Sequence, residues 1–325
     1  MSILLCGMTI EDIYGANVVD ASASTSYYDS TWAPSYLVVP DDGYMSVGVE
    51  PQNDFWLAFN YRVQDSSNIN ADGDLLQIHS TDGGRIMFLD ILDSAWRMYH
   101  CTDGVNWILT KDHRSYEHLA NTVRVDIHVE YNIAASGTVT VTWYLDGNVR
   151  MLTTGTITGT TSDGVGQVRW SCFDNENTAY VSSIIIADED TRGMVLTELT
   201  PDGAGNYTAW DGAYSDMKGA GRGSGIESNV NGDRESWSLA AFEGDTGAVG
   251  MRVVQSVHAY AGSSGVSKID GFCRISSTDY DNGAGVVPNS PGVPTMFEWT
   301  ENPATTAPWT VADLGTLESG VKAVT

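Results

Sequence analysis

Residues 168–199 read VRWSCFDNENTAYVSSIIIADEDTRGMVLTEL, and this stretch decides the fold. Its middle, residues 180–187, first alternates and then becomes a β-branched run that includes three consecutive isoleucines at 184–186. Such a run predicts a strand that is buried on both faces, in the centre of a sheet or under a second layer. The polar block at 188–193 cannot stay in a core, so it predicts a turn or loop. The stretch therefore closes one domain, and it contains no obvious chemistry.

The preceding residues repeat short apolar alternations. In residues 54–63 and 122–131 every second side chain is apolar, which is the pattern of a half-buried strand. Asp-Gly pairs at 82–83, 103–104 and 146–147 separate neighbouring strand candidates and predict hairpins. No helical period lies between these candidates, so the pattern predicts an antiparallel sandwich or jelly roll of roughly a dozen strands.

The sequence pattern changes after residue 200. The sequence PDGAG at 201–205 predicts a turn-rich hinge, and a Gly/Ser/Asn/Asp segment to about 234 predicts a long ordered loop. Strand candidates resume at 236–242, 249–261, 266–276 and 294–299. The chain is therefore predicted to hold two domains, residues 1–200 and residues 201–325.

One helix is predicted at the end of the second domain, over residues 309–320. Thr310 is its expected N-cap, Asp313 stands where a capping box places an acid, and Gly320 lies just past the expected end. The predicted fold class is thus all-β, with a large jelly-roll domain followed by a smaller β-sandwich that carries a short C-terminal helix.

Composition excludes several classes of function. The chain has 42 acidic and 16 basic residues and a formal charge of −26. Nucleic acids and anionic membranes need clustered Lys and Arg, so neither is an expected partner. The N-terminus has no basic region before its short apolar run, so no signal peptide is expected, and no apolar stretch is long enough for a transmembrane helix.

The four cysteines have no metal-binding spacing. Their pairing cannot be deduced from sequence, and buried free thiols are the preferred interpretation. No HExxH, no GxSxG nucleophile motif and no phosphate-binding loop is present. No cofactor and no catalytic residue is therefore predicted, and the protein is expected not to be an enzyme.

The best carboxylate pair for catalysis lies in residues 122–131. Asp126, His128 and Glu130 share one face of this predicted strand because side chains alternate with a period of two. Two carboxylates on one face are what a glycosidase needs for its acid and base. The solvent face of a half-buried strand accounts for the same pattern, and that interpretation is preferred.

Two further sets of residues are candidates for binding. Hard oxygen ligands on loops could hold Ca²⁺, although no EF-hand pattern is present; they are Asp72, Asp74, Asp174 and Glu176. Aromatic rings on or near hairpins could stack on sugars, although core packing is the usual fate of a Trp on a strand; they are Trp96, Tyr99, Trp107 and Tyr116.

Residues 54–205 resemble the concanavalin A-like (laminin-G-like) jelly-roll domains of tailed-phage structural proteins. The resemblance is carried by VTVTWYLDG at 139–147, YVSSIIIADEDTRGM at 180–194 and LTPDGAGNYTAW at 199–210. The closing stretch, residues 299–322, resembles the common end of the same proteins. These segments indicate the fold, and the resemblance implies no catalytic residues.

The resemblance implies a non-catalytic structural component of a phage particle, in the tail, tail tip, fibre or head surface. It also implies a location in the virion, other virion proteins as partners, a homo-oligomer, and weak binding of a host-surface glycan. Two alternatives stay open. One is a carbohydrate-active enzyme of the same sandwich fold that uses Asp126 and Glu130, and the other is a lectin-like module unrelated to a virus.

Overall fold

The computed structural model of the chain forms two compact units, Met1–Leu196 and Thr197–Thr325. Each unit is described by itself. The sequence analysis placed the boundary after residue 200. The structure describes the following residues: 3–7, 17–19, 22–24, 36–39, 44–63, 74–81, 83–92, 95–101, 107–114, 122–132, 138–156, 164–171, 179–217, 225–261, 265–288 and 295–325.

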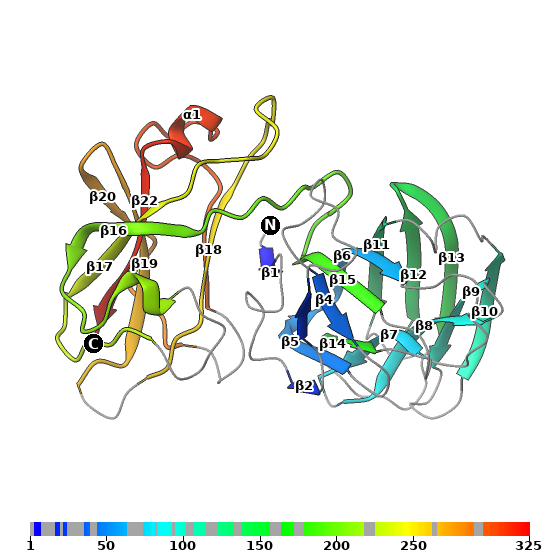
Figure 1. Cartoon of the computed structure of the whole chain (residues 1–325). Helices are drawn as coiled ribbons and strands as arrows, with labels where there is room; N and C mark the ends of the chain where they lie inside the picture. The colour runs from blue at the N-terminus through cyan, green and yellow to red at the C-terminus, as the bar shows by residue number, and fades with distance from the viewer. Residues whose placement is uncertain are drawn as a thin grey trace. The chain divides into compact units, whose positions relative to one another are not determined.

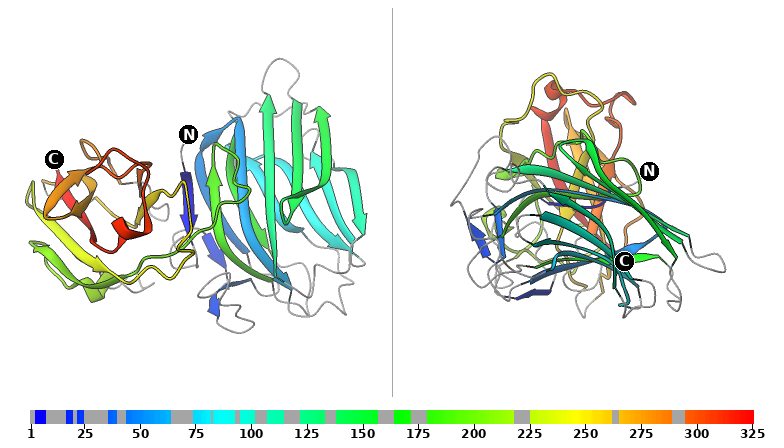
Figure 2. Two further views of the ribbon diagram at one scale, coloured as in Figure 1. Left: turned by 90° about the horizontal axis from the view of Figure 1, so that it is seen from above. Right: turned by 90° about the vertical axis from the view of Figure 1, so that its right-hand side faces the viewer.

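Unit 1 is built from two antiparallel sheets (Figures 1 and 2). Sheet A has the order β13-β12-β11-β6-β15-β4-β3, and β1 also pairs with β15. Its strands are β1 (Ile3–Gly7), β3 (Ser22–Ser24), β4 (Tyr36–Val39), β6 (Asp54–Val63), β11 (Val123–Asn132), β12 (Thr138–Leu145), β13 (Asn148–Thr156) and β15 (Ala179–Ala187).

Sheet B has the order β10-β9-β8-β7-β14-β5-β2. Its strands are β2 (Asn17–Val19), β5 (Tyr44–Gln52), β7 (Asp74–Ser80), β8 (Arg85–Leu92), β9 (Ala95–Cys101), β10 (Trp107–Arg114) and β14 (Val165–Ser171). The predicted hairpins β7/β8, β9/β10 and β12/β13 are all present.

The isoleucine-rich strand is β15, and its predicted central position is confirmed. It pairs with β6 on one side and with β1 and β4 on the other. Ile184, Ile185 and Ile186 are all buried. One extra residue between Ser182 and Ile185 forms a bulge, at which Ser183 has a φ of 51°. The bulge shifts the alternation of β15, so Ile184 and Ile186 point into the core.

The core of unit 1 lies between the two sheets. Trp96 of sheet B is fully buried there, with ring centroids 5.6 Å from Tyr61 and 5.1 Å from Trp143, both of sheet A. Phe59 of sheet A likewise contacts Trp170 of sheet B, at 6.0 Å. Because side chains alternate along a strand, the residues next to these point away from the core. The outer faces of sheets A and B therefore carry the side chains that alternate with the core residues.

Unit 2 is a smaller β-sandwich. Its main sheet has the order β16-β17-β22-β19-β20, and a second sheet pairs β18 with β21. The elements of unit 2 are β16 (Pro201–Thr208), the 3₁₀ turn η1 (Tyr214–Met217), β17 (Arg234–Leu239), β18 (Val253–Val257), β19 (Lys268–Ile275), β20 (Thr278–Asp281), β21 (Thr295–Trp299), α1 (Val311–Leu314) and β22 (Leu317–Val324). A core that includes Trp237, Phe297 and Trp309 fills the unit.

Two local predictions in unit 2 were wrong. The expected hinge at 201–205 is part of β16, an edge strand that pairs with β17. Position 205 of this edge strand has room only for glycine, because a Cβ there would come within 2.4 Å of the Ser236 hydroxyl. The expected helix is real but ends at Leu314, after a capping box between Thr310 and Asp313.

The residues after the helix form β22, which lies in the middle of the main sheet. Gly320 is therefore not a helix cap. It pairs with Ser236 on one side and Phe272 on the other, and a Cβ there would come within 2.4 Å of the Phe272 ring. The close approach of that ring explains the glycine.

The fold class is all-β, as predicted: an antiparallel jelly-roll sandwich, a smaller β-sandwich and one short C-terminal helix. Among the described residues no helix is long and apolar enough to span a membrane. Cys6 and Cys273 are buried thiols, and burial raises the pKa of Cys273 to about 12.

Candidate functional site

A row of side chains crosses the outer face of sheet B. The register places these residues side by side on six adjacent strands, β5, β14, β7, β8, β9 and β10: Ser46, Arg169, Gln77, Phe88, Tyr99 and Leu109. Strands lie about 4.8 Å apart, so the row is about 24 Å long. We call these six residues the sheet B row.

Gln77 and His79 form the polar centre of this face. Both are on β7, where Leu76 and Ile78 point into the core, so the two polar side chains point outward together. His79 Nε2 lies 2.9 Å from Gln77 Oε1, and His79 Nδ1 lies 3.2 Å from the carbonyl of Gly83. If the neutral imidazole donates from Nδ1 to the Gly83 carbonyl, its Nε2 is an acceptor. The Gln77 side-chain amide must then be oriented so that its NH₂ group, rather than its oxygen, faces Nε2.

Arg169 lies beside Gln77, on β14. Its guanidinium carbon is 3.9 Å from the centre of the Tyr44 ring, a close cation–π contact. Among the described residues no carboxylate reaches this guanidinium, and its Nε has no hydrogen-bond partner. Arg169 is therefore a cation on this face that no carboxylate of the described residues pairs with and whose Nε has no partner among them.

The other end of the row is aromatic. Phe88 and Tyr99 stack with their centroids 4.3 Å apart. Arg97 lies over Tyr99 at 5.5 Å and makes two hydrogen bonds to Asp90, at 2.8 and 2.6 Å. Phe88 and Asp90 are buried, whereas Arg97 and Tyr99 are half-buried. The face thus combines rings with hydrogen-bonding groups at their edges.

The predicted aromatic residues have different fates. Tyr99 lies on the outer face just described. Trp96 is fully buried in the core, so the prediction that its ring stacks on a sugar is contradicted by its packing. Trp107 lies in β10 opposite Cys101, and Tyr116 lies outside the described residues.

The predicted Ca²⁺ ligands are not brought together among the described residues. Asp74 begins β7, opposite Asp90. Asp72, Asp174 and Glu176 lie outside the described residues. No group of three or more His, Cys, Asp or Glu side chains in the described part of the chain is arranged to hold a metal ion.

Asp126 and Glu130 lie on the outer face of sheet A. They are four residues apart on β11, so their Cα atoms are about 13 Å apart. Asp126 is 1% exposed, accepts a hydrogen bond of 2.9 Å from Thr191 Oγ1, and lies 3.6 Å from Arg124 Nε. Burial raises the pKa of Asp126, while Arg124 and Thr191 oppose the rise.

His128 lies next to Asp126 on the same face. Its Nε2 is 2.7 Å from Asp54 Oδ1, and its ring stacks on Trp56 with centroids 4.1 Å apart. Arg192, from the polar block after β15, covers the same rings, at 5.5 Å from Trp56 and 4.5 Å from Tyr144. This face of sheet A is therefore covered by the chain itself.

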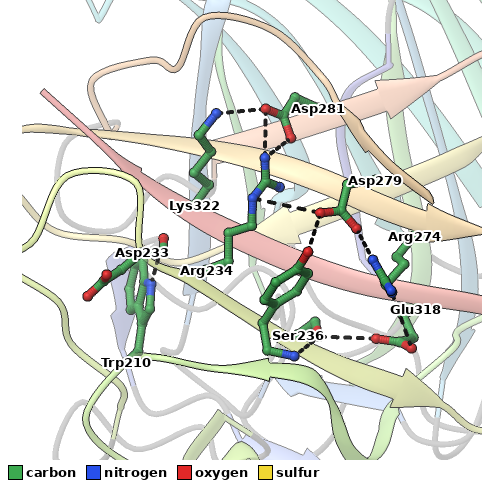
Figure 3. Close-up of polar contacts among 10 residues, drawn as sticks. Trp210, Asp233, Arg234, Ser236, Arg274, Asp279, Asp281, Glu318 and Lys322 are labelled. Carbon is green, nitrogen blue, oxygen red and sulfur yellow. Dashed lines mark hydrogen bonds and ion pairs between the residues drawn. The ribbon is translucent and has the colours of Figure 1, made fainter. Parts of the chain in front are cut away.

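Unit 2 holds the densest ionic cluster among the described residues (Figure 3). Arg274 pairs with Asp279 at 2.5 Å, Lys322 with Asp281 at 2.7 Å, and Arg234 also reaches Asp281, at 2.7 Å. The hydroxyl of Tyr207 donates to Asp279 at 2.6 Å, and this bond is the main cause of the raised pKa of Tyr207. Every cation of the cluster has a carboxylate partner, so the cluster stabilises the sheet and leaves no unpaired charge for a ligand.

Sequence reasoning missed Arg169, Gln77 and His79. The available clue was that each polar residue alternates with core residues, as Gln77 does between Leu76 and Ile78. Nothing in the linear sequence shows that β14 lies beside β7, because that pairing depends on the tertiary fold.

No protein-family model and no curated protein sequence matches the chain. Among solved structures, it is similar to an endo-β-1,4-glucuronan lyase from the fungus Trichoderma reesei, with 10% identity and a TM-score of 0.44 over 59% of this chain and 98% of that one. An alginate lyase from Aplysia kurodai matches with 10% identity and a TM-score of 0.40, over 57% and 99%. The binding domain of botulinum neurotoxin serotype G matches with 8% identity and a TM-score of 0.39, over 55% and 44%.

The expectation of a non-catalytic structural component of a phage particle is contradicted by this comparison. The similar structures include polysaccharide lyases and a toxin binding domain. At these identities the likeness is one of fold and assigns no activity. The expected homo-oligomer, the Ca²⁺ and the location in a virion stay predictions.

Proposed function

We propose that unit 1 is a carbohydrate-active domain that binds an acidic polysaccharide along the sheet B row. The observation that carries this proposal is Arg169, a half-buried cation that no described carboxylate neutralises in a chain with 42 acids and 16 bases. A guanidinium pairs with a planar carboxylate through two parallel hydrogen bonds. Uronic acid units present such a carboxylate.

The aromatic end of the row supports a sugar ligand. The half-buried ring of Tyr99 stacks on the buried ring of Phe88, and Gln77 lies next to Phe88 in the register. Sugar rings have apolar faces and polar edges, so they fit a surface on which rings and hydrogen-bonding groups alternate. The length of about 24 Å suits several sugar units rather than one.

The overall charge of −26 opposes binding of a polyanion at long range. Salt screens such repulsion beyond about 8 Å at physiological ionic strength. The contact at Arg169 acts at much shorter range, so it decides binding once the polymer is close.

Affinity electrophoresis in gels that contain alginate or polyglucuronate tests the proposal. The native protein is expected to be retarded by these polymers and not by a neutral β-glucan. Arg169→Gln is expected to weaken retardation at least tenfold, because the carboxylate partner is lost. Arg252→Gln in unit 2 is the control, since Arg252 is paired with Glu298. Equal retardation of Arg169→Gln and the native protein would contradict the proposal, as would a native protein that neither polymer retards.

A second candidate function is cleavage of the bound polymer by β-elimination. The observation that favours it is that His79 and Gln77 lie beside Arg169. In this reaction a base removes the proton on the carbon next to the carboxylate, the bond to the leaving sugar oxygen breaks, a carbon–carbon double bond forms, and the leaving oxygen takes up a proton. Arg169 and Gln77 can stabilise the carboxylate, and His79 can act as the base once the Gln77 amide releases its Nε2.

The unsaturated product of this reaction absorbs ultraviolet light, which distinguishes it from a product of hydrolysis. His79→Ala is expected to abolish the absorbance while retardation by the polymer remains. The double variant Asp126→Ala/Glu130→Ala is expected to keep the absorbance, because these carboxylates lie on sheet A. Loss of activity in the double variant with an intact fold would instead favour hydrolysis by that pair.

A further inference from the structure

The outer face of sheet A holds a patch of buried polar side chains. Arg124, Asn60 and Ser182 are directly opposite one another on β11, β6 and β15. Asp126 lies two residues along β11, on the same face. Asn60, Asp126 and Ser182 are 2%, 1% and 1% exposed. We call these four residues the polar patch.

Each member of the polar patch has a buried atom without a hydrogen-bond partner among the residues that the structure describes. The four atoms are Asn60 Oδ1, Arg124 Nη2, Asp126 Oδ2 and Ser182 Oγ. Buried polar atoms are nearly always paired, and an unpaired one costs free energy. Four of them lie on three adjacent strands, so a ligand that supplies the missing partners would find them close together.

The chemistry of the patch selects a neutral ligand with hydroxyl groups. Arg124 can only donate and the Asp126 carboxylate only accepts, while Asn60 and Ser182 can do both. The positive charge of Arg124 opposes a metal cation, and the negative charge of Asp126 opposes an anion. A pair of neighbouring hydroxyls can accept from Arg124 and donate to Asp126 at the same time.

Residues 188–194, which we call the strap, contact the patch at Asp126. Thr191 is fully buried and donates its hydroxyl to Asp126 Oδ1 at 2.9 Å. Arg192 is held by Asp190 and lies over the rings of Trp56 and Tyr144. The strap thus occupies both an acceptor and the ring faces that a sugar would use.

We propose that the polar patch, with Trp56 and Tyr144, binds one neutral sugar unit through neighbouring hydroxyls when the strap lifts. Two of the sugar hydroxyls replace Thr191 at Asp126 and supply partners to Arg124, Asn60 and Ser182. The sugar ring replaces Arg192 on the aromatic side chains. This site lies on the opposite sheet from Arg169, so it is independent of the function proposed above.

Titration of the full-length protein with methyl glycosides of glucose, galactose and mannose tests the proposal. Binding is followed by NMR, and strap opening by hydrogen exchange of the amides of residues 188–194. At least one glycoside is expected to bind saturably and to speed exchange in the strap. Thr191→Val is expected to tighten binding several-fold, because the strap loses its hydrogen bond to Asp126 and opens more often.

Ser182→Ala is expected to weaken binding at least tenfold. The variant should fold normally, since the Ser182 hydroxyl has no partner in the closed state. Ser238→Ala in unit 2 is the matched control and should bind as the native protein does. The proposal is overturned if no glycoside alters strap exchange in either the native protein or Thr191→Val, or if Ser182→Ala binds as tightly as the native protein. Arg169→Gln should leave this binding unchanged, so failure here and failure of the polysaccharide site can be told apart.

Discussion

At the scale of the residue, the buried carboxyl group of Asp270 should make the stability of unit 2 depend on pH. It is 1% exposed on the outer face of the main sheet, where Oδ1 accepts from the Gly283 amide at 3.1 Å and Oδ2 has no partner. Burial, and then repulsion from Asp281, raise the pKa of Asp270, while Lys322 and Arg234 oppose the rise. A carboxyl group whose pKa is raised by folding holds its proton more tightly in the native state than in the unfolded state. Its contribution to the free energy of unfolding is therefore fully present below its ordinary pKa. That contribution is lost as pH rises through the raised pKa.

Asp270→Asn should remove the loss of unit 2 stability that accompanies a rise in pH. We expect the variant to gain stability relative to the native protein as pH rises from about 4 towards 7, because the amide carries no charge to bury. Urea unfolding midpoints of unit 2 at both pH values measure the effect. Asp202→Asn, at an exposed position of β16, is the control. A difference between native and variant that does not change with pH would contradict the assignment.

At the scale of the element, β22 explains a glycine that sequence reasoning assigned to a helix end. Gly320 lies under the ring of Phe272, which is fully buried although it points away from the core of unit 2. The guanidinium of Arg234 also lies over that ring, 4.5 Å from its centroid. The Phe272 ring fits at this point of the sheet because its neighbour on β22, Gly320, has no side chain.

Gly320→Ala should destabilise unit 2 by about 1–3 kcal/mol, because the added Cβ would lie 2.4 Å from Phe272 and 2.6 Å from the Glu235 carbonyl. Gly315→Ala is the matched control, since the nearest atom to its Cβ is at 3.6 Å. Chemical denaturation of both variants checks the expectation. Equal stabilities would mean that Phe272 moves aside freely.

At the scale of the whole molecule, the chain has two separate cores. One contains Trp96 and Trp143, and the other contains Trp237 and Trp309. Separate cores allow the two units to unfold in separate steps, so we expect two free energies of unfolding rather than one for the chain.

Trp96→Phe and Trp309→Phe test this separation. Each removes part of a large buried side chain, so each should lower the stability of its own unit by about 1–3 kcal/mol through the cavity that it leaves. Thermal unfolding should show two transitions, with each variant shifting a different one. A single transition that both variants shift equally would show that the units unfold together.

The sequence by itself determined the fold class, most strands of unit 1 and the central place of β15. These features depend on local alternation and on turn residues such as Asp146-Gly147, which act over a few residues. Sequence reasoning also predicted the capping box at Thr310, although the helix stops at Leu314 because Leu317–Val324 pair with β17 and β19.

Only the tertiary structure decided which outward side chains meet. Arg169 and Gln77 are far apart in sequence and become neighbours because β14 inserts beside β7. In the same way, β6, β11 and β15 bring Asn60, Arg124 and Ser182 together. Strand order depends on the packing of the whole core, so no local pattern could place Trp96 inside it or assemble either candidate site.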